Sequence, residues 1–467
     1  MTCHTKYTRA LTFENLCQGV LNMQNLWSFK VNLPMGHRDG YSLYLKPSGI
    51  TLNNPAIYIL ESPENQKLID ALRQHFTRLN ILSGLAPELA SATANNSLYI
   101  EVMLAKFHAE APSAPPPSPS NQSGSEDCHV PFASDSCGAY ALGDLEELSP
   151  LVPWRRIFGA IHDECKELEG EQANCLNSLL GGVHNIIPTK SSYFMRISKA
   201  MERKSFTLNS GKVLSGPSAW SSYLRTRILY DVSTLLPQPF LEANFDLDSQ
   251  ISGVENMPPR WQKCVRAVSK SLPYTTNSLY LALHFSPKAR GEGEAIVDFI
   301  KRSFIKDLRA EEWFDEETRG EALKKAMAMA IHVGSPSEYV ALKYDVSAGA
   351  YFNNSMNANK AKVLRDLSLL EQVPDRGRWN MQAYAVNAYY DNTVNGVFIP
   401  AGLLQPPFFN ESAPMEQNFG GFGAIIGHEI THGFDNLGSQ FDSDSNVRDW
   451  WSPLVAKVLP RFEKSHL

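Results

Sequence analysis

Residues 420–435 read Gly-Gly-Phe-Gly-Ala-Ile-Ile-Gly-His-Glu-Ile-Thr-His-Gly-Phe-Asp, and no other stretch says as much about the fold. The run from Ala424 to Ile426 is apolar, so we expect a helix over about residues 422–434 that enters a packed core. Two histidines and a glutamate follow this apolar entry within one helical turn. The stretch therefore predicts a buried helix that presents polar groups on one side.

The spacing of these polar groups points to a zinc site. His428 and His432 are four residues apart, so they share one helix face and their imidazoles can converge on one Zn²⁺. Glu429 is rotated by about 100° from His428, which places it beside the metal, where it can take the proton of a zinc-bound water. The alternative is a surface helix with two solvated histidines. In a chain of 467 residues with 12 histidines, a chance His-Glu-x-x-His has a probability of only about 2%.

The same segment excludes one class of zinc protease. A metzincin continues the motif with a glycine and a third histidine, at the positions that Asp435 and Gly438 occupy here. The third ligand is therefore expected from elsewhere in the chain, and a downstream glutamate is the usual alternative.

Upstream of this segment the sequence pattern is mainly helical. Amphipathic stretches cover residues 66–82 and 98–108, and helical spacing dominates from about 145 to 373. Asp315 is expected to cap a helix that reaches about Ala330. One apolar stripe at helical spacing is expected to pack in the core, and it comprises Ile296, Phe299, Ile300, Phe304 and Leu308.

Strand patterns appear only in the last quarter of the chain. Residues 384–390 and 397–399 are β-rich, and Asn395-Gly396 between them is a hairpin signal. The region that carries the histidines is therefore expected to contain a small sheet.

Length and pattern together predict a mainly α (α+β) fold with two domains. A chain of this length exceeds the size of a single hydrophobic core. We expect a large helical domain over residues 1–375 and a strand-containing domain over residues 376–467. The Pro/Ser-rich residues 111–127 cannot bury a core and are expected to form an extended surface insertion.

Composition excludes several functions. The net charge is −6, with no basic run of the kind that binds nucleic acid, so we expect no nucleic-acid partner. The sequence contains no run of 18 apolar residues, so we expect no transmembrane helix. The first residues do not resemble a signal peptide. The sequence makes no prediction for the oligomeric state.

Cysteines and sequons favour an oxidising compartment. In such a compartment Cys128–Cys137 and Cys165–Cys175 could each close a short disulfide loop. Four asparagines begin Asn-x-Ser sequons, which accept glycans in secreted proteins: Asn95, Asn121, Asn353 and Asn410. These signals agree with an extracellular setting.

Several segments besides the zinc motif resemble the neprilysin/endothelin-converting-enzyme family of zinc metalloendopeptidases. They are Arg260–Cys264 (RWQKC), Val386–Tyr390 (VNAYY), Phe398–Phe409 (FIPAGLLQPPFF), Gly420–Gly423 (GGFG), Gly427–Asp435 (GHEITHGFD) and Asp449–Trp451 (DWW). The resemblance is strong over about residues 257–452, fainter back to about Asn32, and absent from the Pro/Ser-rich insertion. It implies that residues 376–467 are the first part of an incomplete thermolysin-like domain.

The resemblance implies a role for each residue of the zinc motif. His428 and His432 would bind one zinc ion per chain, and Glu429 would activate the attacking water. Asp435 would be the carboxylate that orients an imidazole.

Three further residues match functional or structural positions of the family. Asn387 and Ala388 would hold the substrate backbone along an exposed edge strand, since such a strand can pair with a peptide. The alternative for Asn387 is a turn or strand-end residue. Cys264 matches a family cysteine that forms a disulfide.

The function that the resemblance implies is hydrolysis of short peptides on the amino side of apolar residues. The helical domain would cap the site and restrict it to small peptides. The family also implies a location on the extracellular face of the plasma membrane, as a type II membrane protein, or secretion. Membrane association would need a segment that this sequence does not contain.

The sequence departs from the family pattern at its end. The family takes its third zinc ligand from a Glu-x-x-x-Asp motif well downstream of the second histidine, and the chain ends at Leu467 without that motif. The later histidine and arginine that stabilise the transition state and grip the substrate are also missing. We therefore expect a truncated chain with little or no activity. The alternative function is a non-catalytic isoform or inactive paralogue that binds peptides or a protein partner.

Overall fold

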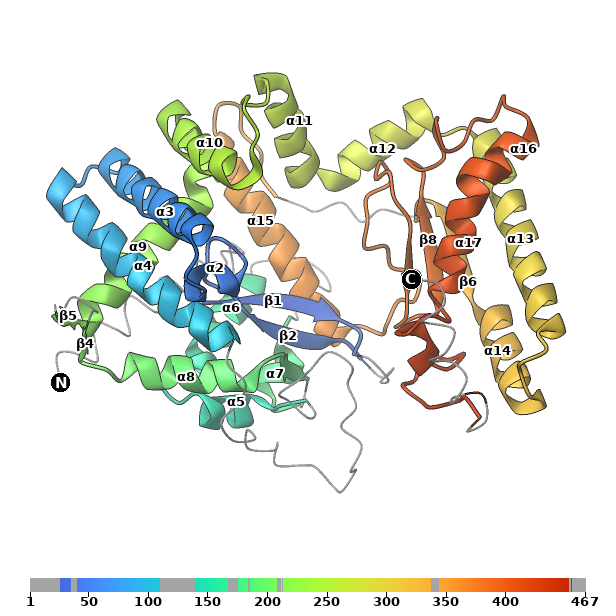
Figure 1. Ribbon diagram of the computed structural model, residues 1–467, viewed down its shortest axis with the longest axis horizontal. Coiled ribbons are helices and arrows are strands. Elements are labelled where there is room, and N and C mark those ends of the chain that lie inside the picture. Colours follow the sequence, from blue (N-terminus) through green and yellow to red (C-terminus); the bar gives the residue numbers. More distant parts are fainter. Residues whose placement is uncertain are drawn as a thin grey trace. The chain divides into compact units, whose positions relative to one another are not determined.

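The computed structural model divides into two compact units (Figure 1). The structure describes residues 26–34, 40–109, 139–166, 175–183, 185–207, 211, 213–336, 344–452 and 455. Helices dominate these residues and the strands are short, which confirms the predicted mainly α fold. The predicted insertion, the Cys128–Cys137 loop and Asn121 lie outside the described residues.

The first unit lies within residues 1–32, 41–267 and 343–372. Its described elements are β1 (Trp27–Asn32), β2 (Ser42–Pro47), α2 (Pro55–Ile59), α3 (Pro63–Leu82), α4 (Pro87–Ala109), α5 (Leu142–Leu148), α6 (Trp154–Lys166), α7 (Asn177–Leu180), β3 (Ile186–Pro188), α8 (Ser191–Met201), β4 (Ser205–Thr207), β5 (Val213–Ser215), α9 (Gly216–Val232), η2 (Ser233–Leu235), α10 (Gln238–Ser252), the first part of α11 (Arg260–Ser271), α15 (Tyr351–Ser368) and η3 (Leu369–Glu371).

The core of the first unit is formed by α3, α4 and α9, which pack side by side (Figure 1). The helix predicted over residues 66–82 begins earlier, at Pro63, because the Ser62 hydroxyl caps it by accepting the Asn65 N–H at 3.1 Å. The helix predicted over residues 98–108 is the second half of the longer α4.

A small mixed sheet completes this unit. Its strand order is β1-β2-β3, with β1 antiparallel and β3 parallel to β2. Cys165 and Cys175 form the predicted disulfide, with their Cα atoms 6.0 Å apart. Cys264 on α11 is exposed and unpaired, so the disulfide that the family implies for it is not formed among the described residues.

The second unit lies within residues 33–40, 268–342 and 373–467. Its described elements are the end of α11, α12 (Pro273–His284), α13 (Pro287–Ala310), α14 (Glu316–Ala328), β6 (Ala330–Gly334), β7 (Tyr389–Asp391), β8 (Gly396–Pro400), α16 (Met415–Asn418), the π-helical turn η4 (Phe419–Gly423), α17 (Ala424–Thr431) and η5 (Gly438–Gln440). Asp315 caps α14 as predicted, accepting the Thr318 N–H at 2.9 Å.

The compact units are divided differently from the predicted domains. The prediction assigned residues 268–342 to the helical domain, whereas in the structure they pack with residues 373–467. The reason is strand pairing across the chain, since β6 pairs in parallel with β8, and α13 packs against α17. The sheet order is β6-β8-β7, which leaves β7 at an edge.

Of three local predictions in this unit, the hairpin is confirmed, and the strand and the apolar stripe need correction. The strand expected over residues 384–390 is reduced to β7, because residues before it turn inward and the Ala383 N–H donates to the buried Asn277 side chain at 2.9 Å. The hairpin at Asn395 is confirmed, and this residue adopts a positive φ of 47°. The apolar stripe of α13 is buried at Ile296 and Leu308, but Phe299 is 54% exposed at its margin.

Candidate metal centre

The rotation of α17 about its axis decides where its histidines point. Ile426 and Ile430 are fully buried and belong to the same apolar core as Ile296 of α13. Gly433 follows at a place where a Cβ would lie 2.9 Å from the Met329 side chain, so glycine allows the chain to pass close to the core. Because one face of α17 is fixed in the core, the opposite face is exposed.

The two histidines meet on that exposed face. His428 and His432 place their Nε2 atoms 3.0 Å apart, with the ring planes at 81°. Two zinc–nitrogen bonds of about 2.0–2.1 Å at a tetrahedral angle would separate the two nitrogens by about 3.3 Å. The observed spacing is close to this value, so the pair fits a zinc ion after a shift of a few tenths of an ångström.

Asp435 fixes the orientation of the second imidazole. Its Oδ2 lies 2.7 Å from His432 Nδ1, and its Oδ1 accepts the Leu437 N–H at 2.9 Å and the Gly438 N–H at 2.8 Å. Burial alone would raise the pKa of Asp435, but the hydrogen bonds from Gly438, His432 and Leu437 hold it below its usual range. An ionised carboxylate only accepts, so Nδ1 of His432 carries the proton and Nε2 keeps its lone pair for a metal.

Glu429 lies between the exposed histidines and the core. Its side chain is buried, at 7% exposure, and one of its carboxylate oxygens lies within 4.8 Å of the ligand nitrogens of both histidines. His428, Glu429 and His432 are the group of metal-binding side chains that converges within the described part of the chain. The two imidazole nitrogens suit zinc, and the Glu429 carboxylate lies beside them, where a base would act.

Asn387 and Ala388 lie next to the edge strand rather than in it. Both precede β7, and Asn387 is exposed while Ala388 is buried. The Asn387 side chain accepts the Ala388 N–H at 2.9 Å, so this donor is used within the chain. The pair therefore lies just before β7, in residues without regular secondary structure.

Sequence reasoning missed two residues that support the loop after α17. Lys325 of α14 is 1% exposed and donates to the carbonyls of Gly438 and Phe441, both at 2.6 Å. Burial lowers the pKa of Lys325 to about 7, although the charges of Asp442 and Asp435 act in the opposite direction. Asn395 donates to the Ser443 carbonyl at 3.1 Å. The available sequence signal was a lysine beside alanines of the predicted helix, which is weak by itself.

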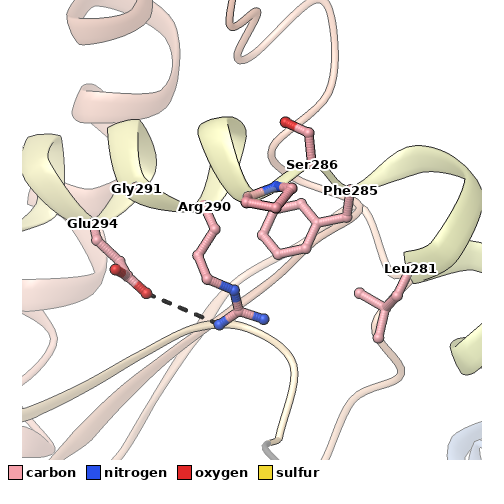
Figure 2. A pocket seen from close by; sticks show the side chains of 7 residues that line it. Leu281, Phe285, Ser286, Arg290, Gly291 and Glu294 are labelled. Carbon is pink, nitrogen blue, oxygen red and sulfur yellow. Dashed lines mark ion pairs between the residues drawn. The ribbon is translucent and has the colours of Figure 1, made fainter.

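A separate pocket of about 300 Å³ lies at the start of α13, and none of the predicted site residues lines it (Figure 2). The Arg290 guanidinium points across it, 3.9 Å from the Glu294 carboxylate and 2.8 Å from the Val333 carbonyl. The charged groups of the pocket are therefore engaged with each other and with the backbone.

The sequence matches two models of the peptidase family M13. The N-terminal model covers residues 7–336 and the second covers residues 387–464. Human endothelin-converting enzyme-like 1 is 26% identical over 93% of this chain and 52% of its own length. Mouse membrane metallo-endopeptidase-like 1 is 35% identical over 50% of this chain and 32% of its own length. The chain spans about half, or less, of the length of these relatives.

Solved structures show the same fold. A zinc metalloprotease of Mycobacterium tuberculosis in complex with an inhibitor aligns with a TM-score of 0.77 at 21% identity, over 97% of this chain and 62% of that one. PepO of Lactobacillus rhamnosis aligns with a TM-score of 0.76 at 20% identity, over 99% of this chain and 68% of that one.

These matches confirm the resemblance seen in the sequence. The first family model alone covers more than half of the chain, and both neprilysin-like and endothelin-converting-enzyme-like proteins are among the relatives. The chain therefore belongs to peptidase family M13.

Proposed function

We propose that this chain carries the zinc-binding helix of a metalloendopeptidase that hydrolyses short peptides on the amino side of apolar residues. The observation that carries the proposal is the convergence of three side chains at the end of α17. The Nε2 atoms of His428 and His432 face each other at 3.0 Å, and the buried carboxylate of Glu429 lies close to both. The structural neighbour solved with an inhibitor is itself a zinc metalloprotease.

Each residue has a distinct task in this proposal. His428 and His432 hold the metal, and Asp435 keeps His432 in the tautomer that presents Nε2. When bound, zinc supplies Lewis acidity, which polarises the scissile carbonyl and makes water more acidic. Glu429 accepts the proton of the attacking water and later passes it to the leaving amine.

The substrate would lie along the open edge of the sheet. β7 is an edge strand, and Asn387 and Ala388 directly precede it in the chain. An extended peptide can add to such an edge through its main chain. We therefore propose Asn387 and Ala388 as the residues that hold the substrate backbone, with peptides as the partners of this site.

The number of ligands limits what this polypeptide does by itself. The described residues bring two imidazoles and one carboxylate together, and catalytic zinc sites normally use three protein ligands in addition to water. With Glu429 acting as the base, the described residues supply two zinc ligands, so these ligands alone would hold zinc weakly. The second candidate function, which needs no third ligand, is a non-catalytic product that binds peptides or a protein partner.

We further propose an extracellular location for this site, at the membrane surface or in secreted form. The Cys165–Cys175 disulfide needs an oxidising compartment. The sequon asparagines Asn95, Asn353 and Asn410 are exposed. Within the described residues, no helix has the length and apolarity needed to cross a bilayer.

The decisive experiment is zinc-dependent hydrolysis of short peptides with an apolar residue after the scissile bond. The purified chain is compared with Glu429→Gln, which keeps the side-chain shape but removes the base. Loss of the base should lower any turnover by about 10²–10⁴-fold while zinc binding is retained. His428→Ala is the control that should abolish both.

The outcomes separate the two candidate functions. Turnover that Glu429→Gln leaves unchanged would contradict the proposed mechanism. No turnover by the parent chain, together with zinc binding that depends on His428, would favour the non-catalytic function. Robust turnover that Glu429→Gln abolishes would contradict the expectation of weak activity and would require a third ligand.

A further inference from the structure

A buried lysine supports the loop that follows the metal-binding helix. Lysine is almost never fully buried without a partner, yet the side chain of Lys325 is only 1% exposed. Its ammonium donates to the carbonyls of Gly438 and Phe441, both at 2.6 Å. Both acceptors belong to one short turn, so a single side chain of α14 holds both ends of that turn.

This turn is in direct contact with the carboxylate that orients His432. The N–H of Gly438 donates to Asp435 Oδ1 at 2.8 Å, while the carbonyl of the same residue accepts from Lys325. Gly438 is also packed against the end of α17, where a Cβ would lie 2.0 Å from the His432 carbonyl oxygen. A movement of Gly438 would therefore be transmitted to both Asp435 and His432.

The lysine is itself fixed from the opposite side. Asn395 donates through its amide to the Lys325 carbonyl at 3.2 Å and to the Ser443 carbonyl at 3.1 Å. Trp450 donates from Nε1 to the Phe441 carbonyl at 3.0 Å. The hairpin, α14 and the loop after α17 thus form one buried polar network, with Lys325 at its centre.

We propose that Lys325 is a positioning residue for the zinc site, which holds residues 438–441 so that Asp435 keeps His432 protonated at Nδ1 and ready to bind metal through Nε2. This inference rests on the proposed function of the two histidines. A lysine suits the task because its ammonium has several donors on a long stem, and two converging carbonyls need a separate donor each. Methionine has a similar volume but would leave both carbonyls without this donor.

The test uses the zinc-free protein, so that it does not depend on activity. The ring nitrogens of ¹⁵N-labelled histidine report the tautomer of His432 by NMR, and comparison with His432→Gln assigns its signals. We expect the parent chain to show the Nδ1-protonated form and Lys325→Met to show a mixture of tautomers. In a competition titration with a chromophoric chelator, zinc affinity should fall about tenfold or more.

Two controls separate positioning from general stability. Leu72→Ala removes a fully buried side chain from the first unit, and it should lower stability while leaving the His432 tautomer and zinc affinity unchanged. The double variant Lys325→Met/Asp435→Asn should bind zinc no more weakly than Asp435→Asn alone, because Lys325 acts through Asp435. If Lys325→Met does not fold, Lys325→Gln, which keeps one donor group, should show a smaller change in the same direction.

The inference and the proposed function can fail separately. An unchanged His432 tautomer in a folded Lys325 variant would overturn the positioning role, whatever the zinc affinity. A change equal to that caused by Leu72→Ala would also overturn it. If the parent chain shows no histidine-dependent zinc binding, the proposed function fails, while the tautomer measurement still decides the role of Lys325.

Discussion

The two units each contain a cluster of polar and charged side chains. The cluster in the first unit, the closed cluster, is shielded from solvent, whereas the cluster in the second unit, the open cluster, faces solvent on one side. In the first unit, Glu101 is fully buried and accepts hydrogen bonds from Tyr58 at 2.6 Å and from the Thr51 hydroxyl at 2.7 Å. Arg227 lies 3.7 Å from it and is also buried. In the second unit, the His428 and His432 rings are open to solvent on one side.

The difference shows which groups serve the fold and which are left for a ligand. Burial raises the pKa of Glu101, although the charge of Arg227 and the hydrogen bonds from Tyr58 and Thr51 act in the opposite direction. The charged groups of this cluster are paired with each other inside the protein. Around α17, Asp435 and Lys325 are engaged with the backbone, whereas among the described residues the facing Nε2 atoms have only each other. A cluster that is closed except at two nitrogens is typical of a metal site.

The largest effect is expected from opening the closed cluster. Arg227→Met should destabilise the first unit by about 3–5 kcal/mol, because it leaves Glu101 buried without its cation. Urea unfolding followed by tryptophan fluorescence measures this loss. Arg155→Ala removes an exposed ion pair with Glu146 at 3.2 Å and should cost less than about 1 kcal/mol. Similar losses for the two variants would show that the buried cluster is not special.

A smaller effect is expected from Asp435→Asn, which weakens the open cluster. An amide has one acceptor oxygen, so it cannot accept from His432 and from the Leu437 and Gly438 N–H groups on both sides as the carboxylate does. Zinc affinity should fall about 10–100-fold. Chelator competition measures it, and Arg227→Met, if folded, should bind zinc like the parent chain. Undiminished affinity in Asp435→Asn would show that this carboxylate does not support the site.

The smallest effect is a pH dependence of stability due to Lys325. Its folded-state pKa is lowered to about 7, whereas an unfolded lysine titrates near 10.4. Between these values the unfolded chain binds more protons, so the unfolding free energy should rise with pH, by at most about 1.4 kcal/mol per pH unit. Below about pH 7 both states are protonated and the contribution is constant. Urea titrations at pH 7 and 8 should show a rise of about 1 kcal/mol in the parent chain that Lys325→Met lacks. Equal values in the two proteins would contradict the lowered pKa.

Local features of both units could be predicted because they depend on residues close in sequence. The cap at Asp315, the hairpin at Asn395 and the Cys165–Cys175 disulfide each involve neighbours along the chain. Helix ends were predicted less accurately. The helix predicted from residue 98 is part of α4, which begins at Pro87. The strand predicted over residues 384–390 failed because a side chain far along the sequence, Asn277, draws the backbone into a turn.

The sequence alone determined the candidate zinc motif, with its two ligands and its base, and the protein family. His428, Glu429 and His432 lie on one turn of one helix, so helical geometry brings them together whatever the rest of the chain does. Only the tertiary structure decided what supports them. Lys325 and Gly438 are 113 residues apart, and Arg227 and Thr51 are 176 apart. Such contacts depend on how whole elements pack, as when β6 pairs with β8, and no local pattern records which distant carbonyl or carboxylate a buried cation will reach.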